Sequence, residues 1–279
     1  MLMQDIHQEI QEAVNYFVDG IRKSGNFSAC YLTGSYAERY AVTKVSDIDI
    51  TVVSESPLDE IQRQNLESLI QNVDHTHGVN LDVSPVVVAG ELYQGQSTFL
   101  GIAFREAVIS AKLAGHLIWG RDVFARIPMP SKDEYVDATR KIPFEFSNRI
   151  RGYSNSPFPL GFPNEHDQYF GYLGKHVDGN ASTKPLISLM TWIGTGTVAL
   201  ISGTPVGNKK QCVDALKEID LGKGVELARL FDLCRREWKY RLPASPNDQQ
   251  DLRDICARAL VWENEYHDKF FPDMQRLGT

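Results

Sequence analysis

The stretch Tyr31–Val53, YLTGSYAERYAVTKVSDIDITVV, decides the fold of the N-terminal half of this chain. A short strand is predicted over residues 28–33. Gly34 and Ser35 form a turn directly after it, and Ser35 begins the helix-like segment SYAERYA. The chain then returns as a second predicted strand, residues 48–53, with Asp47 and Asp49 at its entrance. A carboxylate at the mouth of a buried strand is costly unless positive charge lies beside it. These two aspartates therefore predict a positively charged partner.

Asp47 and Asp49 are two residues apart on a strand, so both side chains leave the same face, while Ile48 and Ile50 point into the core. Two neighbouring carboxylates repel each other unless a divalent cation lies between them. Mg²⁺ suits such a pair, because it takes one or two protein carboxylates and completes its shell with water and substrate phosphates. The spacing therefore predicts a Mg²⁺ site.

A third acid follows on the next predicted strand, residues 79–88, which reads VNLDVSPVVV. Polar and apolar residues alternate at its start, so Asp82 lies on the polar face of a strand expected to neighbour residues 48–53. A third carboxylate can complete a second metal site or accept the proton of an attacking hydroxyl, as in two-metal phosphoryl displacement. We therefore expect Asp47, Asp49 and Asp82 to be catalytic, to bind metal, and to hold two Mg²⁺ ions.

Gly34 and Ser35 lie at the turn after the first strand. A glycine there permits a positive φ and lets the backbone approach a ligand closely. Ser35 begins a short helical segment, whose unpaired N–H groups and hydroxyl favour an anion. The turn is predicted to bind an anion.

These features together resemble the DNA polymerase beta-type nucleotidyltransferase superfamily. The shared pattern is Gly34–Ser35, then Asp47-Ile48-Asp49-Ile50 twelve residues later, then a strand aspartate, Asp82. The resemblance implies an α/β nucleotidyltransferase domain, a mixed sheet flanked by helices, that uses ATP and Mg²⁺.

Apolar periodicity divides the chain into two parts at a proline-bearing break, residues 126–130. Before the break, helices are predicted over 4–24, 58–73 and 102–118, in addition to the three strands. After it, the predicted elements are all helices: 131–150, 166–177, 184–202, 208–219, 224–240 and 248–270. We therefore predict a nucleotidyltransferase domain over residues 1–130 and an all-α helical-bundle domain, binding the acceptor, over residues 131–279.

Two longer segments, residues 104–128 and 189–216, resemble the streptomycin/spectinomycin-type aminoglycoside adenylyltransferases. This resemblance implies transfer of AMP from ATP to a hydroxyl of a small molecule such as an aminoglycoside, with release of pyrophosphate and a role in antibiotic resistance. It further implies that Gly34, Ser35 and Ser46 hold the triphosphate of the nucleotide. It also implies that Lys209, with Lys210 as the alternative register, reaches the nucleotide from the helical domain.

The sequence departs from those enzymes in ways that leave the acceptor open. Their third acid is typically glutamate, whereas this chain has Asp82, and residues 131–279 contain 20 Lys and Arg against 20 Asp and Glu. A polycationic antibiotic needs an acidic cleft. The acidic residues of the helical domain that are candidates for lining one are Glu145, Glu165, Asp167 and Asp178. Another small molecule, a protein or a tRNA therefore stay open as acceptors, as does a non-catalytic nucleotide-binding regulator. The basic run over residues 234–241 would serve a macromolecular acceptor, and Trp192 either stacks on a ligand or belongs to the core.

Composition and charge narrow the classes of partner and the cellular compartment that fit this chain. The net charge is −7, and non-specific nucleic-acid binding needs a basic surface. We find no apolar run near the ~18–20 residues that span a bilayer, and no secretory signal at the N-terminus. The four cysteines lie far apart and fit reduced, buried thiols. We expect a cytoplasmic enzyme with no membrane partner; the net charge disfavours a nucleic-acid partner without excluding a tRNA acceptor that binds a local basic patch.

Overall fold

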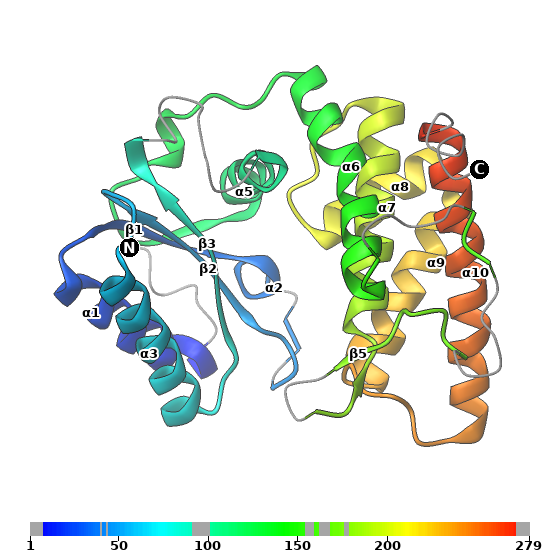
Figure 1. Cartoon of the computed structure of the whole chain (residues 1–279), viewed down its shortest axis with the longest axis horizontal. Coiled ribbons are helices and arrows are strands. Elements are labelled where there is room, and N and C mark those ends of the chain that lie inside the picture. Colours follow the sequence, from blue (N-terminus) through cyan, green and yellow to red (C-terminus); the bar gives the residue numbers. More distant parts are fainter. Residues whose placement is uncertain are drawn as a thin grey trace. The chain divides into compact units, whose positions relative to one another are not determined.

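The computed structural model describes residues 8–39, 41–42, 44–90, 101–153, 159–161, 168–175 and 179–271. The chain divides into two compact units, Met1–Ser131 and Lys132–Thr279 (Figure 1).

The first unit is built on a four-stranded sheet with the order β3-β2-β1-β4. The strands are β1 (Phe27–Thr33), β2 (Ile48–Ser54), β3 (Leu81–Val88) and β4 (His116–Gly120). β1 runs antiparallel to both β2 and β4, whereas β2 and β3 are parallel. The predicted mixed sheet is thereby confirmed.

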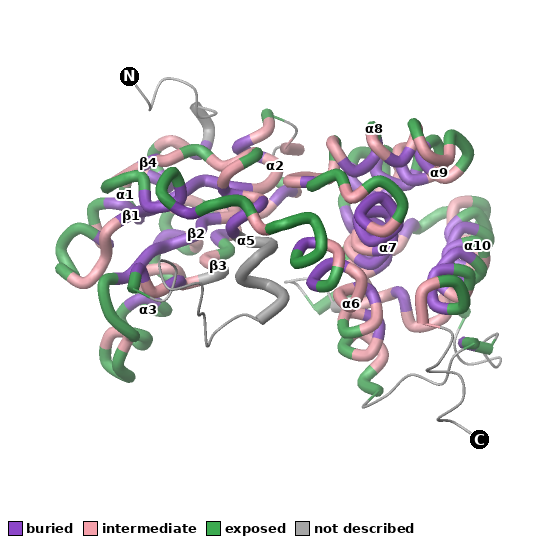
Figure 2. Tube along the Cα trace, turned by 90° about the horizontal axis from the view of Figure 1, so that it is seen from above, coloured by how far each residue is buried: buried purple, intermediate pink, exposed green. Residues whose placement is uncertain are grey.

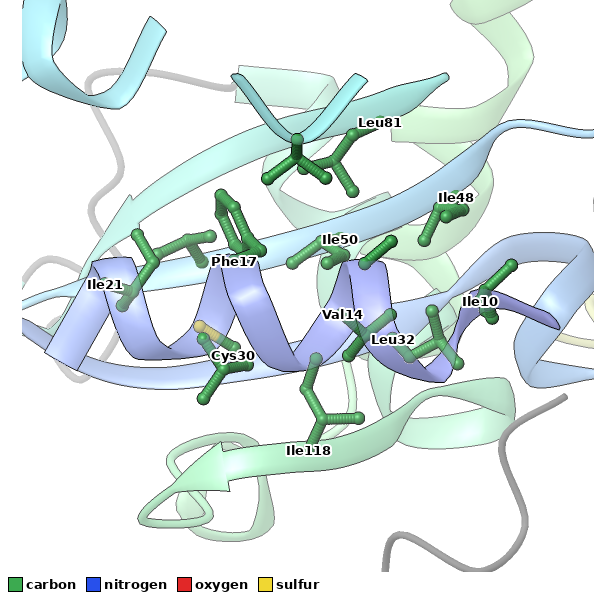
Figure 3. Close-up of a cluster of buried hydrophobic side chains, with 14 of the residues drawn as sticks. Ile10, Val14, Phe17, Ile21, Cys30, Leu32, Ile48, Ile50, Leu81 and Ile118 are labelled. Atoms are coloured by element: carbon green, nitrogen blue, oxygen red, sulfur yellow. The ribbon is translucent and has the colours of Figure 1, made fainter. Parts of the chain in front are cut away.

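Helices cover both faces of this sheet (Figure 1). Helices α1 (Gln8–Ser24) and α3 (Glu60–His77) pack on one face, and α5 (Gly101–Ala114) and the 3₁₀ turn η1 (Phe124–Arg126) pack on the other. Figure 3 shows the first of these two cores, in which Phe17 and Val14 of α1 lie against Ile50 of β2. The short helix α2 (Gly34–Ala37) connects β1 to the segment that leads into β2.

Local sequence fixes the ends of α3, which leads the chain to β3. The Asp59 side chain accepts a hydrogen bond from the Gln62 N–H at 2.8 Å, and the Gln62 side chain accepts one from the Asp59 N–H at 3.0 Å. This reciprocal capping box satisfies two backbone donors at the start of the helix. Gly78 ends the helix in the left-handed conformation, with φ +62°.

Three predicted helices are wrong in part. The helix predicted over 102–118 ends at Ala114, and β4 begins two residues later. The segment 166–177 is not helical where it is described, since residues 168–171 form a turn and β5 follows at Gly174–Lys175. The helix predicted over 224–240 breaks into α9 (Leu221–Phe231) and a π-helical stretch, η2 (Asp232–Glu237).

The second unit is helical, as predicted. Its elements are α6 (Lys132–Arg151), α7 (Lys184–Ser202), α8 (Lys209–Ile219), α9 (Leu221–Phe231), α10 (Pro246–Phe270) and a small β5–β6 pair, Gly174–Lys175 with Ala181–Ser182. Helix α7 is the central helix, and it packs against α6, α8, α9 and α10. Figure 2 shows most of α7 as buried.

Helix α7 is long and apolar enough to cross a membrane by length and composition alone, with a mean hydropathy of 1.4. The expectation that no segment reaches that length is therefore wrong for Lys184–Ser202. However, 67% of its most apolar window is buried inside the structure, as in the core helix of a globular unit.

A buried ion pair joins the end of α6, the first helix of the second unit, to α10, its last helix. Arg151 donates two hydrogen bonds to the Glu263 carboxylate, at 3.0 and 2.9 Å, and the Tyr172 hydroxyl donates a third at 2.6 Å. Glu263 is fully buried, so its charge depends on these three donors. The cluster holds α6 to α10 and is a structural feature of the unit.

Candidate active site

The three predicted aspartates come together at the N-terminal ends of β2 and β3. The parallel register pairs Asp49 directly with Asp82, and Asp47 lies just before β2. One carboxylate oxygen from each of the three lies within 4.8 Å of the other two. The parallel pairing therefore converts two sequence motifs 33 residues apart into one acidic cluster.

The alternation predicted from the sequence is confirmed around this cluster. Ile48 and Ile50 are buried in the core under α1 and α3, at 1% and 0% exposed, whereas Asp47 and Asp49 are half-buried. Asp82 is exposed to solvent. Three carboxylates this close repel one another, and oxygen donors at this spacing are what Mg²⁺ binds. The donor set therefore fits a divalent cation.

Gly34 is required by the position of Asp49. Gly34 has φ +63°, and a Cβ built on it would overlap the Asp49 carboxylate. The backbone of the turn therefore lies directly against one of the acids. Thr33, the residue before it, pairs with Asp49 across the sheet, and its hydroxyl donates to the Asp49 carbonyl at 3.3 Å.

Ser35 is the second residue of α2 and is half-buried, next in sequence to the glycine that touches Asp49. The other end of α2 is tied to the sheet, because His116 Nε2 of β4 lies 2.8 Å from the Ala37 carbonyl oxygen. The turn predicted to bind phosphate thus lies beside the acidic cluster and is anchored at both ends.

Ser46 is buried, and it makes two hydrogen bonds within the loop before Asp47. Its Oγ accepts a hydrogen bond from the Val42 N–H at 2.9 Å, and its own N–H donates to the Val42 carbonyl at 2.9 Å. Ser46 therefore closes the loop that delivers Asp47 to the cluster.

Two further polar residues lie near Asp47, and sequence reasoning did not assign either to the site. Asn80 Nδ2 donates to Asp47 Oδ1 at 2.5 Å, and the Asp74 carboxylate accepts the Leu81 N–H at 2.7 Å. Burial raises the pKa of Asp74, the hydrogen bond from Leu81 opposes this rise, and the negative charge of Asp47 adds to it. The alternation at the start of the third predicted strand placed Asn80 on its polar face, but it did not indicate the contact with Asp47.

The candidate site residues that the sequence offers within residues 131–279 belong to the second unit. Lys209 is the first residue of α8 and is half-buried, while Lys210 forms an ion pair with Asp214 at 2.6 Å on the surface. Trp192 is half-buried on α7, and Glu145 is exposed on α6. Glu165, Asp167 and Asp178 lie outside the described residues.

The basic run 234–241 does not form one exposed patch. Cys234 and Arg235 are buried, at 0% and 2% exposed, and Arg236 forms an ion pair with Asp232 at 3.5 Å. The other three cysteines are also buried and free, as the sequence predicted.

Comparison with known proteins agrees with this geometry. Residues 21–106, which span β1 to the start of α5, match the family described as the nucleotidyltransferase domain. No curated protein matches the sequence.

One solved structure extends the likeness in fold to both units. The spectinomycin adenyltransferase AAD(9) from Enterococcus faecialis, crystallised with ATP and spectinomycin, is similar in fold at 14% identity with a TM-score of 0.54. That match covers 90% of this chain and 98% of the other. A toxin–antitoxin structure with AMP-PNP matches at 21% identity and a TM-score of 0.27, over 50% of this chain and 91% of that one. The first unit therefore contains a nucleotidyltransferase domain over residues 21–106, and a helical unit follows it.

Proposed function

We propose that the protein transfers AMP from ATP to a hydroxyl group of a small-molecule acceptor and releases pyrophosphate, with Mg²⁺ bound by the aspartate cluster. The observation that supports this most strongly is the meeting of Asp47, Asp49 and Asp82 within 4.8 Å, beside the Gly34–Ser35 turn. An acidic cluster alone is common on protein surfaces. A glycine turn packed against one member of the cluster gives the phosphates of a nucleotide a place next to the cation.

Each residue has a role in this proposal. Asp47 and Asp49 hold the first Mg²⁺, and Asp82 completes a second cation site or accepts the proton of the acceptor hydroxyl. Ser35 and the N–H groups of its turn bind the β- and γ-phosphates, with Ser46 shaping the loop behind them and Lys209 contacting the nucleotide. Mg²⁺, when bound, neutralises phosphate charge and lowers the pKa of an attached hydroxyl.

The reaction forms one bond and breaks one bond. The acceptor oxygen attacks the α-phosphorus of ATP and loses its proton to the exposed carboxylate of Asp82. The bond between the α-phosphorus and the bridging oxygen breaks, and pyrophosphate leaves. Asp49, which is half-buried and held by the sheet, keeps its position during this step.

An aminoglycoside-like antibiotic is the acceptor class that the fold favours, since the similar enzyme was crystallised with spectinomycin and matches along both units. Antibiotic resistance is the role that this acceptor implies. A tRNA or other nucleic acid is disfavoured by the burial of Arg235 within the basic run. We place the enzyme in the cytoplasm, where ATP is abundant.

The test is incubation with labelled ATP and, separately, a panel of aminoglycosides, tRNA and a cell lysate, followed by mass spectrometry of the product that gains the label. We expect an AMP adduct on a small molecule, which disappears in the Asp49→Asn variant. An adduct on protein or tRNA would overturn the acceptor, and ATP binding without any adduct would overturn the enzyme activity.

A further inference from the structure

Asn80 contacts the entrance of β2 through both its backbone and its side chain. The Ile48 N–H donates to the Asn80 carbonyl at 2.8 Å, and the Asn80 side-chain amide donates to Asp47 Oδ1 at 2.5 Å. Asn80, the residue just before β3, thus contacts two consecutive residues at the entrance of β2, Asp47 and Ile48.

Asp47 differs from the other two acids in how the fold positions it. Asp49 lies within β2 and Asp82 within β3, so hydrogen bonds of the strand ladders fix both residues. Asp47 precedes β2, where the regular ladder has not yet begun. Its carboxylate orientation therefore depends on side-chain contacts more than that of its neighbours.

The chemistry of the contact fixes the orientation of the Asn80 amide. An ionised carboxylate only accepts hydrogen bonds, so the amide must present its NH₂ group to Asp47. The amide is also neutral, and it therefore holds the carboxylate without competing for the cation as a lysine or arginine would.

Asp74 anchors the same strand start from the other side. Its carboxylate accepts the Leu81 N–H at 2.7 Å, one residue after Asn80. The peptide group that joins Asn80 to Leu81 is consequently held at its carbonyl by β2 and at its N–H by α3, which fixes the backbone position from which the Asn80 side chain reaches Asp47.

We propose that Asn80 is a positioning residue for the cation site. It binds Oδ1 of Asp47 and thereby directs the carboxylate so that Oδ2 is presented to a divalent cation shared with Asp49 and Asp82. Partners of this kind commonly change metal affinity or activity by ~10- to 100-fold. This inference rests on the proposed function of the aspartate cluster.

Asn26 offers a matched control at the opposite end of β2. Its carbonyl accepts the Glu55 N–H at 2.9 Å, and its side-chain amide donates to Gln62 at 3.2 Å. Asn26 and Asn80 therefore make the same two kinds of contact at strand ends, and only Asn80 reaches an aspartate of the cluster.

The test is titration of Mn²⁺, followed by electron paramagnetic resonance, into the wild-type protein and the Asn80→Ala, Asn80→Leu and Asn26→Ala variants. We expect both Asn80 variants to bind Mn²⁺ at least ~10-fold more weakly, and Asn26→Ala to bind it as the wild type does. Asn80→Leu keeps the volume of the side chain, so a loss confined to Asn80→Ala would indicate packing and overturn the inference. Equal affinity in all four proteins would also overturn it while leaving the cation site intact, whereas no Mn²⁺ binding by the wild type would contradict the proposed function itself.

A measurement on the wild type keeps the inference testable if the variants do not fold. Mg²⁺ titration of protein labelled with ¹⁵N at asparagine should shift the side-chain amide signal of Asn80 and leave that of Asn26 unchanged. An Asn80 signal that does not respond to saturating Mg²⁺ would overturn the inference.

Discussion

The backbone of Gly34 lies directly against the carboxylate of Asp49, so closely that a Cβ at position 34 would overlap it. The turn after β1 and the acid within β2 are therefore built as one unit. Any side chain at position 34 must displace either the turn or Asp49.

The Gly34→Ala variant should lose activity out of proportion to its loss of stability. A non-glycine residue at φ +63° costs about 1–2 kcal/mol of folding stability, and displacement of Asp49 adds a defect at the site itself. Gly78→Ala is the matched control, because Gly78 has φ +62° and no atom within 4 Å of the added Cβ. Thermal melts should show at least as much destabilisation in Gly34→Ala as in Gly78→Ala, while only Gly34→Ala loses adenylyl transfer. Similar activity in the two variants would separate the turn from the chemistry.

Replacing Asp49 by Asn should remove activity without weakening the fold. The change keeps the shape of the side chain and removes a charge that holds the cation, so turnover should fall by ~10²- to 10³-fold. Without Mg²⁺, the free energy of unfolding should be equal to or above that of the wild type, because one of three mutually repelling carboxylates is neutralised. Steady-state assays and urea denaturation measure the two effects. Near-normal turnover in this variant would rule out Asp49 as a cation ligand.

Asp82 is the exposed member of the cluster, and its replacement tests its separate role. Asp82→Asn should lose turnover and still bind ATP through Asp47, Asp49 and the phosphate turn. Asp82→Glu, which introduces the acid typical of the aminoglycoside enzymes, should retain activity if the acceptor lies as it does in those enzymes. Calorimetry with ATP and kinetic assays separate binding from turnover. Full activity of Asp82→Asn would remove this residue from the mechanism.

Much of the site follows from the sequence because short-range patterns determine it. Alternation around Ile48 and Ile50 places the aspartates on one face of β2, and a glycine after a strand indicates a turn with positive φ. The pairing of Asp49 with Asp82 also follows, since the helix between the two strands is of the length that joins parallel neighbours. Asn80 was not assigned, because its partner Asp47 lies outside the strand ladder and side-chain pairs of that kind have no sequence period.

The errors in the fold have physical causes as well. The apolar run from Ile102 to Ile118 satisfies helical spacing, yet the chain turns at Gly115 and continues as β4. β4 is an edge strand that pairs only with β1 among the described strands, so five residues are enough to form it. In the second unit, the π-helical stretch Asp232–Glu237 interrupts a pattern that reads as one continuous helix.

The second unit should lose stability at mildly acidic pH through His267. Burial, with the nearby positive charge of Arg151 as a smaller cause, lowers the pKa of His267 from 6.5 to about 3. Between these two pH values the unfolded chain binds a proton that the folded chain does not, so stability falls as pH decreases, by about 1.4 kcal/mol per unit. The difference in unfolding free energy between pH 7 and pH 5 should be about 2 kcal/mol smaller in His267→Leu than in the wild type. Urea denaturation at both pH values measures this, and equal differences in the two proteins would exclude His267 as the cause.

Nucleotidyl transfer is tested most directly by following the two ends of ATP in one reaction. The protein is incubated with Mg²⁺, a hydroxyl-bearing acceptor that forms an adduct, and ATP labelled with ³²P at either the α- or the γ-phosphate. The α-label should appear on the acceptor and the γ-label in pyrophosphate, and Asp49→Asn should abolish both products. Transfer of the γ-label to the acceptor, or release of the γ-label as inorganic phosphate with no labelled acceptor, would contradict nucleotidyl transfer at this site.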